Sequence, residues 1–166
     1  MSVYEPIFEA LNTAGVRYVV VGGLATVLHG YARLTADVDL AVDLAPEEAS
    51  RVIQTLAAIG FRPQAPVDPK AFADRTIRDQ WVREKHMRAF SLIDPANPMR
   101  VVDLLLEHGV PFEDLWAHSQ ETTVYTTKIR IASIDHLITL KRRAGRFQDL
   151  ADIEQLEAIR RRKQTE

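Results

Sequence analysis

Residues 20–42 read VVGGLATVLHGYARLTADVDLAV, and this stretch decides the fold of the chain. An apolar strand runs into Gly22 and Gly23, a short helical segment follows, and a second strand carries Asp37 and Asp39. Side chains alternate between the two faces of a strand, so the two aspartates project from the same side. The stretch therefore predicts an α/β arrangement that forces a pair of carboxylates together.

Paired carboxylates repel each other unless they share a proton, face a basic partner or bind a divalent cation. Mg²⁺ prefers oxygen ligands and usually arrives with substrate phosphates, so it suits Asp37 and Asp39, with Mn²⁺ as an alternative ion. Gly22 and Gly23 lack Cβ atoms and let a phosphate approach the backbone N–H groups at the start of the next helix. The sequence thus predicts a combined metal and phosphate site.

The loop before the aspartates contains further candidates for phosphate binding. Arg33 can pair with triphosphate oxygens, and the Thr35 hydroxyl can hydrogen-bond them. An equally weighted alternative is that Arg33 neutralises Asp37 or Asp39 in an empty site. His29 can contact a phosphate or a base, but its place at a helix end favours an interaction with the last carbonyls of that helix.

These motifs carry a family resemblance. Gly-Gly after a strand, Asp-x-Asp on the next strand and a third carboxylate on a later one resemble the nucleotidyltransferase superfamily with the polymerase-β-type fold. The longer string GG, HG and R-x-T-x-D-V-D-L is most similar to the AbiEii type of nucleotidyltransferase, known as toxins of toxin–antitoxin pairs. The resemblance implies transfer of a nucleoside monophosphate from an NTP to an acceptor hydroxyl or phosphate, with two Mg²⁺ ions.

In this resemblance the third carboxylate is Asp103, within residues 100–106, RVVDLLL. A carboxylate in an otherwise apolar strand is costly to bury unless an ionic or hydrogen-bonding partner meets it, which supports a role in the site. If this strand lies beside the one with Asp37 and Asp39, all three carboxylates share a face. They would then hold both metal ions, and Asp103 would help to deprotonate the acceptor.

Residues 140–152, LKRRAGRFQDLAD, resemble the C-terminal motif of AbiEii-like proteins. The resemblance implies that Lys141 reaches the nucleotide phosphates, while Asp149 and Asp152 order the junction of two helices. The alternative is a surface ion-pair network near a helix start. We favour a functional Lys141 and structural aspartates.

Residues 75–88 concentrate basic side chains around Trp81. Basic residues beside an aromatic ring can hold a nucleic-acid acceptor by phosphate contacts and stacking. Interleaved acidic residues, however, are typical of a solvated helix face, and a lone tryptophan is more often a core anchor. The acceptor therefore stays open, with RNA such as tRNA, a protein hydroxyl or a small molecule as candidates.

The expected fold class is α/β (α+β), with a mixed sheet carrying the carboxylates and helices packed on it. We expect a nucleotidyltransferase core over residues 1–120 and a C-terminal hairpin and helical region over 121–166 that closes the nucleotide cleft, in one unit. Helices are expected over 3–14, 24–29, 46–60, 71–85, 112–119, 134–144 and 147–161, a strand over 17–21, and hairpins over 87–106 and 122–131.

Composition agrees with this interpretation. The chain has 166 residues, 46% of them apolar, which is enough for one core. A net charge of −2 argues against a strongly basic nucleic-acid binder. There is no cysteine and no apolar run of membrane-spanning length, so we expect a cytoplasmic protein without membrane contact.

Two other functions remain open at this stage. One is a non-catalytic, antitoxin-like module of the same fold that binds a nucleotide or a partner chain. If the protein is instead a toxin, its expected partner is a cognate antitoxin. The other is a metal-dependent phosphohydrolase, which would release phosphate without labelling an acceptor. Incorporation of label from an α-labelled NTP separates both from a transferase.

Overall fold

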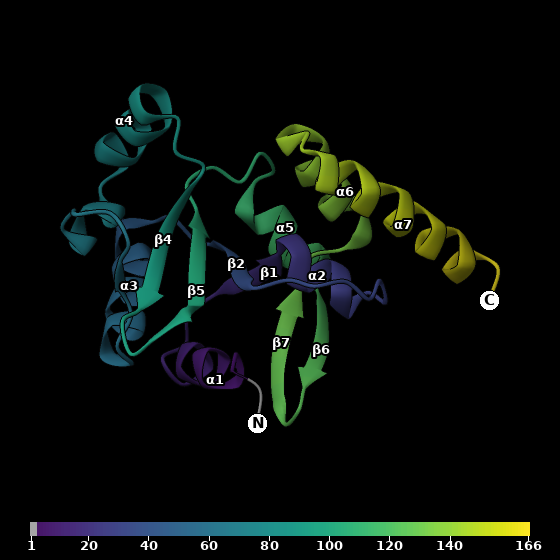
Figure 1. The fold of residues 1–166 in the computed structure, drawn as a ribbon, viewed down its shortest axis with the longest axis horizontal. Coiled ribbons are helices and arrows are strands. Elements are labelled where there is room, and N and C mark those ends of the chain that lie inside the picture. The colour runs from purple at the N-terminus through teal and green to yellow at the C-terminus, as the bar shows by residue number, and fades with distance from the viewer. Residues whose placement is uncertain (1–2) are drawn as a thin grey trace.

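A seven-stranded mixed sheet runs through the computed structural model, which describes residues 3–166 (Figure 1). Its order is β3-β4-β5-β2-β1-β7-β6. The pairs β2/β5 and β1/β7 are parallel, and the other four are antiparallel. The strands are β1 (Tyr18–Val21), β2 (Asp37–Val42), β3 (Arg62–Pro63), β4 (Ala89–Asp94), β5 (Asn97–Leu105), β6 (Gln120–Val124) and β7 (Thr127–Ile131). The predicted mixed α/β class is confirmed.

Seven α-helices and one 3₁₀ helix surround the sheet within the same residues. They are α1 (Glu5–Thr13), α2 (Gly22–Leu28), α3 (Pro46–Ala58), η1 (Pro69–Ala73), α4 (Arg75–Lys85), α5 (Phe112–His118), α6 (Ile134–Ala144) and α7 (Phe147–Gln164). None of them is long and apolar enough to cross a membrane. The first two residues of the expected 1–120 core lie outside the described part.

Several helix boundaries differ from the prediction by one to three residues, and one expected helix is split. The helix expected over 71–85 is split at Asp74, whose carboxylate accepts a hydrogen bond from the Ile77 N–H (3.2 Å) and so begins α4 after η1. Helix α2 begins at Gly22 rather than Leu24, so both glycines lie in its first turn instead of preceding it. Helix α7 continues to Gln164, three residues beyond the expected end.

One face of the sheet packs into the core. Phe90 of β4 stacks on Phe72 of η1 and on Trp81 of α4, with ring centroids 5.5 and 5.2 Å apart. Trp81 is 5% exposed, so its predicted role as a core anchor is confirmed. Neighbouring strands place Leu40 and Leu104 on the same buried face. Strand alternation then sends the side chains between these residues to the opposite face.

The opposite face of β4, β5 and β2 carries the polar side chains. Asp37, Asp39, Ser91 and Asp103 are half-buried there. The strand with Asp103 does lie beside the strand with the aspartate pair, as the sequence required for a three-carboxylate site. This open face therefore positions the candidate site.

The C-terminal hairpin joins the same sheet. Strand β7 pairs in parallel with β1 through Val20 and Ile131, and β6 forms the sheet edge. Ser133 caps the N-terminus of the following helix α6, and its hydroxyl accepts a hydrogen bond from the His136 N–H (3.2 Å). Helices α6 and α7 then pack against each other (Figure 1), and residues of both line the same cleft as Asp39.

Candidate active site

Asp39 and Asp103 are register partners on the parallel strands β2 and β5. Asp37 lies two residues before Asp39, on the same face. On the far side of β5, the Ser91 hydroxyl donates a hydrogen bond to Asp103 Oδ1 (2.6 Å), and Ser91 is itself the register partner of Asp103. The sheet thus lines up three carboxylates and one hydroxyl across three strands.

Burial disfavours the charged form of Asp39 and Asp103, and neighbouring carboxylates add to the effect. Burial, followed by the charges of Asp103 and Asp37, raises the pKa of Asp39 to about 7. Burial also raises the pKa of Asp103, against the hydrogen bond from Ser91. Within residues 3–166, none of the three aspartates forms an ion pair with a lysine, arginine or histidine. The burial of Asp39 and Asp103 is therefore not offset by a paired side-chain cation in the described part of the chain.

A divalent cation fits this donor set chemically, because oxygen ligands that lack a cationic partner are what Mg²⁺ prefers. As the side chains stand, no three acidic or histidine groups in the described part of the chain surround a common point. The backbone register of Asp39 and Asp103 is in place, and the Asp103 carboxylate is held by Ser91. Asp37, Asp39 and Asp103 are the residues that would hold an ion here, and the ion would neutralise their charges.

Gly22 is required by its contact with Asp39. Its φ is +65°, and a Cβ atom built there would collide with the Asp39 carboxylate. The first turn of α2 therefore touches the carboxylate pair directly. Because a helix N-terminus offers unpaired N–H groups, the geometry brings an anion-binding end next to the acidic cluster.

The loop before β2 folds over the second glycine. A Cβ atom at Gly23 would lie 2.6 Å from Thr35 Oγ1 and 2.7 Å from Arg33 Nη2. Arg33 does not pair with Asp37 or Asp39; its Nη2 donates to Asp152 Oδ2 (2.9 Å). The alternative in which Arg33 neutralises the aspartate pair is therefore wrong, because α7 supplies a fully buried carboxylate nearer to it.

Lys141 belongs to the same buried network. Its side chain is 5% exposed, and Nζ donates to Asp152 Oδ2 (2.7 Å), the oxygen that also accepts from Arg33. The other carboxylate oxygen of Asp152 accepts from Gln148 (2.9 Å). Asp152 is 0% exposed, so the alternative of a surface ion-pair network is also wrong. Through Arg33, Lys141 and Asp152, the network connects the loop before β2 to α6 and α7.

Arg146 closes the junction between α6 and α7. Its backbone N–H and its Nε both donate to Asp149 Oδ2, at 3.1 and 2.8 Å. Asp149 is 2% exposed, whereas the Arg146 side chain is 76% exposed and its charge lowers the pKa of Asp39. Asp149 and Asp152 thus order this junction as expected, while Arg146 places a positive charge near Asp39.

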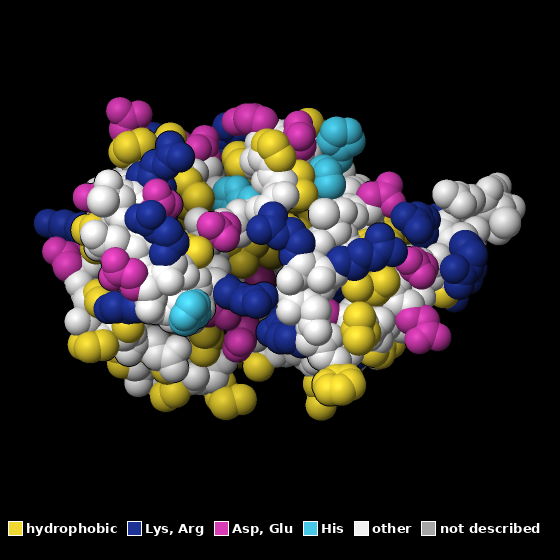
Figure 2. Space-filling view, turned by 90° about the horizontal axis from the view of Figure 1, so that it is seen from above, with side chains coloured by type: hydrophobic (Ala, Val, Ile, Leu, Met, Phe, Trp, Pro, Cys, Tyr) yellow, Lys and Arg dark blue, Asp and Glu magenta, His cyan; other side chains and the backbone are white. Residues whose placement is uncertain are grey.

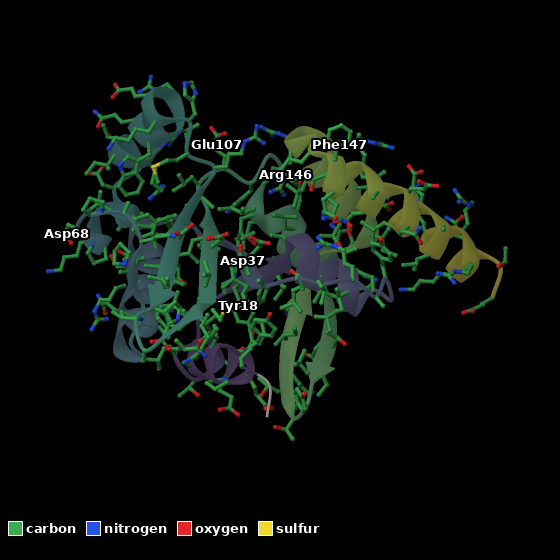
Figure 3. All side chains as sticks on the ribbon, viewed as in Figure 1. Tyr18, Asp37, Asp68, Glu107, Arg146 and Phe147 are labelled. Carbon is green, nitrogen blue, oxygen red and sulfur yellow. The ribbon has the colours of Figure 1, made fainter. Side chains whose placement is uncertain are left out.

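A cleft of about 430 Å³ opens above the carboxylates. Figure 2 shows it as a hollow between the part with α4 and the part with α6 and α7, with acidic side chains in its depth and lysine and arginine side chains around it. In Figure 3, Glu107 and Arg146 lie above Asp37, one from the loop after β5 and the other from the α6–α7 junction. Gly22, Asp39 and Lys141 line the same cleft.

Sequence reasoning missed two side chains near the carboxylates. Ser91 has no local signal, because only its register with Asp103 places it there. Residues 140–152 have signals in their lysine and aspartates but none that singles out Arg146. Segment 75–88, a candidate acceptor site in the sequence, does reach the cleft, where His86, Met87 and Arg88 line the opposite wall beyond the end of α4. Only the topology brings this segment to the aspartates.

Two other candidates are structural. His29 is buried, and its Nε2 lies 2.8 Å from the carbonyl oxygen of Ala132, in a different element from its own helix. Burial lowers the pKa of His29, so the neutral ring donates this hydrogen bond. Arg78 is 5% exposed and donates to the carbonyl oxygen of Phe72 (2.6 Å), which withdraws it from any nucleic-acid surface.

No protein-family model matches the chain, and no curated protein matches its sequence. Solved structures do resemble it. The lincosamide antibiotic adenylyltransferase LnuA, bound to lincomycin, has a TM-score of 0.59 and 20% identity over 93% of this chain and 94% of that one. ANT(2'')-Ia in complex with adenylyl-2''-tobramycin has a TM-score of 0.58 and 12% identity over 98% and 95%.

An antigenic nucleotidyltransferase-like protein from Paracoccidioides brasiliensis has a TM-score of 0.57 and 17% identity, over 95% of this chain and 73% of that one. All three identities lie below the level at which activity follows from similarity, since one fold carries many functions. They agree, however, on the arrangement of the sheet and helices. The chain therefore has the fold of the nucleotidyltransferases.

Proposed function

We propose that this protein transfers a nucleoside monophosphate from an NTP to an acceptor hydroxyl or phosphate. The observation that carries the proposal is the register of Asp39 with Asp103, because Asp39 lines a cleft that is also lined by Gly22, at the N-terminus of α2. This arrangement places a carboxylate cluster and an anion-binding helix end side by side. A metal–triphosphate complex needs both.

Two Mg²⁺ ions, or Mn²⁺ in their place, would be held by Asp37, Asp39 and Asp103, and would supply charge neutralisation for the phosphates. The first turn of α2, with Gly22 and Gly23, would bind phosphate oxygens through backbone N–H groups. In the transfer, an acceptor oxygen forms a bond to the α-phosphorus and the bond to pyrophosphate breaks. The acceptor proton would pass to the Asp103 carboxylate.

The cations of the buried network complete the proposal. Arg33, Thr35 and Lys141 would stabilise the triphosphate, although Asp152 now accepts hydrogen bonds from both Arg33 and Lys141. A phosphate would have to share these cations with Asp152. The fully buried carboxylate of Asp152 holds these cations in position before the nucleotide arrives.

The AbiEii motifs extend this proposal to a toxin of a toxin–antitoxin pair, with a cognate antitoxin as partner. The support is the string from Gly22 to Leu40 and the Lys141 motif. Two of the structural neighbours named above, LnuA and ANT(2'')-Ia, contain an antibiotic or an adenylylated antibiotic, which supports small molecules as candidate acceptors. Growth arrest on expression, relieved by a neighbouring gene product, tests the toxin role.

One observation favours the non-catalytic alternative: both predicted phosphate cations are already neutralised by Asp152. Calorimetric titration of each NTP with Mg²⁺ separates the two functions. A transferase binds an NTP only with Mg²⁺, and Asp39→Ala abolishes that binding. An Asp135→Ala variant, which changes an exposed carboxylate on α6, should bind as the native protein does.

Turnover then requires label from an α-labelled NTP to appear in an acceptor. Asp37→Ala, Asp39→Ala and Asp103→Ala should each remove it. Release of inorganic phosphate without labelled acceptor would indicate a phosphohydrolase. If all three variants keep the native activity, the assignment of the site is wrong.

A further inference from the structure

We propose that the wall of the cleft beyond α4 is the acceptor site and that it takes a small, mainly apolar compound with a hydroxyl group. The inference rests on the proposed function, since it assigns the second substrate of the same cleft. Val82, Met87 and Leu105 form the apolar part of this wall, and His86 lies at its edge.

The direction of the reaction places the acceptor on this wall. Phosphoryl and nucleotidyl transfers proceed with the attacking and leaving oxygens in line on opposite sides of the phosphorus. In the proposed function, pyrophosphate is held on the side of α6 and α7, where Lys141 and Arg143 line the cleft. The acceptor oxygen must then approach from the other side. That side is formed by the end of α4 and the ends of β4 and β5.

The chemistry of this wall differs from that of the wall across the cleft. Val82, Met87 and Leu105 are half-buried apolar residues that border the core, and they leave part of their surface to the cleft. The charged members are one cation, Arg88, and one carboxylate, Glu107, both exposed. Neither forms an ion pair with any residue of 3–166.

A single cation and a single carboxylate give this wall no net charge. A polycationic acceptor needs several carboxylates, and a nucleic-acid strand needs several cations along its backbone. Apolar surface instead favours a ligand that buries carbon atoms, with few polar contacts for orientation. The wall therefore suits an acceptor without a multiple charge of either sign.

His86 supplies the polar contact. It has φ 53° and ψ 30° at the end of α4, the left-handed conformation that glycine adopts most easily. The adjoining N–H of Met87 donates to the carbonyl oxygen of Trp81 (3.1 Å), so the helix end itself would accept a glycine. The exposed imidazole makes no hydrogen bond with residues 3–166. We assign it to hydrogen bonding of the acceptor hydroxyl.

The proposed step is balanced without further reactants. The acceptor hydroxyl oxygen forms a P–O bond to the α-phosphorus, the bond between that phosphorus and the bridging oxygen breaks, and pyrophosphate leaves with the electron pair. The hydroxyl proton passes to Asp103. His86 orients the hydroxyl, and it is a binding residue that needs no change of its own protonation state.

The first test maps three probes on the native protein by amide NMR shifts, with benzyl alcohol as the apolar hydroxyl compound, tobramycin as the polycation and an RNA trinucleotide as the polyanion. We expect benzyl alcohol alone to shift Val82, Met87 and Leu105, with millimolar affinity. The proposal is overturned if either charged probe shifts these residues in preference, or if no probe shifts them. Because these titrations need no nucleotide, their failure is distinct from a failure to bind Mg²⁺–NTP.

The second test uses His86→Gly, with His118→Gly as a control in an exposed position at the end of α5. A glycine suits the left-handed position, so we expect an unfolding temperature at or above the native one. Benzyl alcohol affinity should fall about fivefold to tenfold, the equivalent of one hydrogen bond, and Mg²⁺–NTP affinity should not change. If His86→Gly binds benzyl alcohol as tightly as the native protein does, His86 contributes only to the end of α4. That result would overturn its proposed role in binding the acceptor.

Discussion

Asp39 and Asp103 face each other across the parallel strands β2 and β5, although α3, α4 and β4 lie between them in the chain. Neither has a cationic partner within ion-pair distance, and both carry a raised pKa. The fold therefore holds two carboxylates together at a cost in stability. Raised pKa values of buried carboxylates are typical of functional sites.

The first prediction concerns the pH dependence of stability without metal. The pKa of Asp39 is about 7 in the folded protein and near 3.8 in the unfolded chain. Between pH 4 and pH 7, Asp39 keeps its proton in the folded protein but loses it in the unfolded chain. The free energy of unfolding therefore falls as pH rises from 4 to 7. Asp39→Asn should remove this loss and exceed the native stability at pH 8 by on the order of 3 kcal/mol.

Urea unfolding in EDTA at pH 4.5 and pH 8 measures the effect. Asp135→Asn on α6 is the control, because this carboxylate is exposed and should give equal differences at both pH values. A stability gain of Asp39→Asn that is the same at pH 4.5 and pH 8 would contradict the raised pKa.

The second prediction compares two glycines with similar backbone conformation. Gly22 has φ +65° and Gly15 has φ +70°, but only a Cβ atom at Gly22 collides with the Asp39 carboxylate, whereas the space around Gly15 is open. Gly15→Ala should cost about 1 kcal/mol for the left-handed backbone. Gly22→Ala should cost at least about 2 kcal/mol more, because the carboxylate must move.

Calorimetry provides the second readout for this pair. We expect Mg²⁺–NTP binding to disappear in Gly22→Ala and to persist in Gly15→Ala. Equal denaturation midpoints for the two variants would mean that the contact between α2 and Asp39 relaxes freely.

The third prediction concerns Asp152. Its removal leaves Arg33 and Lys141 without their shared carboxylate, and Lys141 is buried. Breaking a buried ion pair by removing one partner costs about 3–5 kcal/mol. Asp152→Ala should therefore lower the free energy of unfolding by about that amount in urea titrations.

The matched control is Asp135→Ala, which removes an exposed ion pair to Arg160 of 2.6 Å. An exposed pair is worth at most about 1 kcal/mol. A loss in Asp152→Ala no larger than in this control would mean that water already reaches the network.

The fourth prediction concerns His108, in the loop that lines the cleft after β5. Its Nε2 is buried and has no hydrogen-bond partner among residues 3–166, and burial lowers its pKa to about 4. The unfolded chain binds a proton near pH 6.5, so His108 contributes stability above pH 6.5 that is lost as pH falls toward 4.

His108→Gln cannot gain this charge. Between pH 7 and pH 4.5 the native protein should lose on the order of 2 kcal/mol relative to this variant, as measured by urea midpoints. His118→Gln, at an exposed position, should follow the native pH profile. If the stability of the native protein and of His108→Gln changes equally with pH, the pKa of His108 is not lowered in the folded state.

Much of the fold follows from local sequence. Local signals include the hydrophobic period of α3, the proline in its first turn, the Ser133 cap and the apolar run around Asp103. The structure contains the elements that these signals predict. The boundary at Asp74 was missed because a capping aspartate inside a helical pattern looks like any solvated residue of a helix. The early start of α2 was missed because glycines usually precede a helix, not begin it.

The sequence by itself determined that Asp37 and Asp39 share one face, because strand alternation is a property of the backbone. It also determined that Asp103 needs a polar partner, since burial of a lone carboxylate is costly in any fold. Only the tertiary structure decided that Ser91 and Asp39 are the neighbours of Asp103, that Asp152 binds Arg33 and Lys141, and that the end of α4 forms the far wall of the cleft. These contacts join residues from distant parts of the chain, and their partners are chosen by strand register and helix packing, which no local pattern encodes.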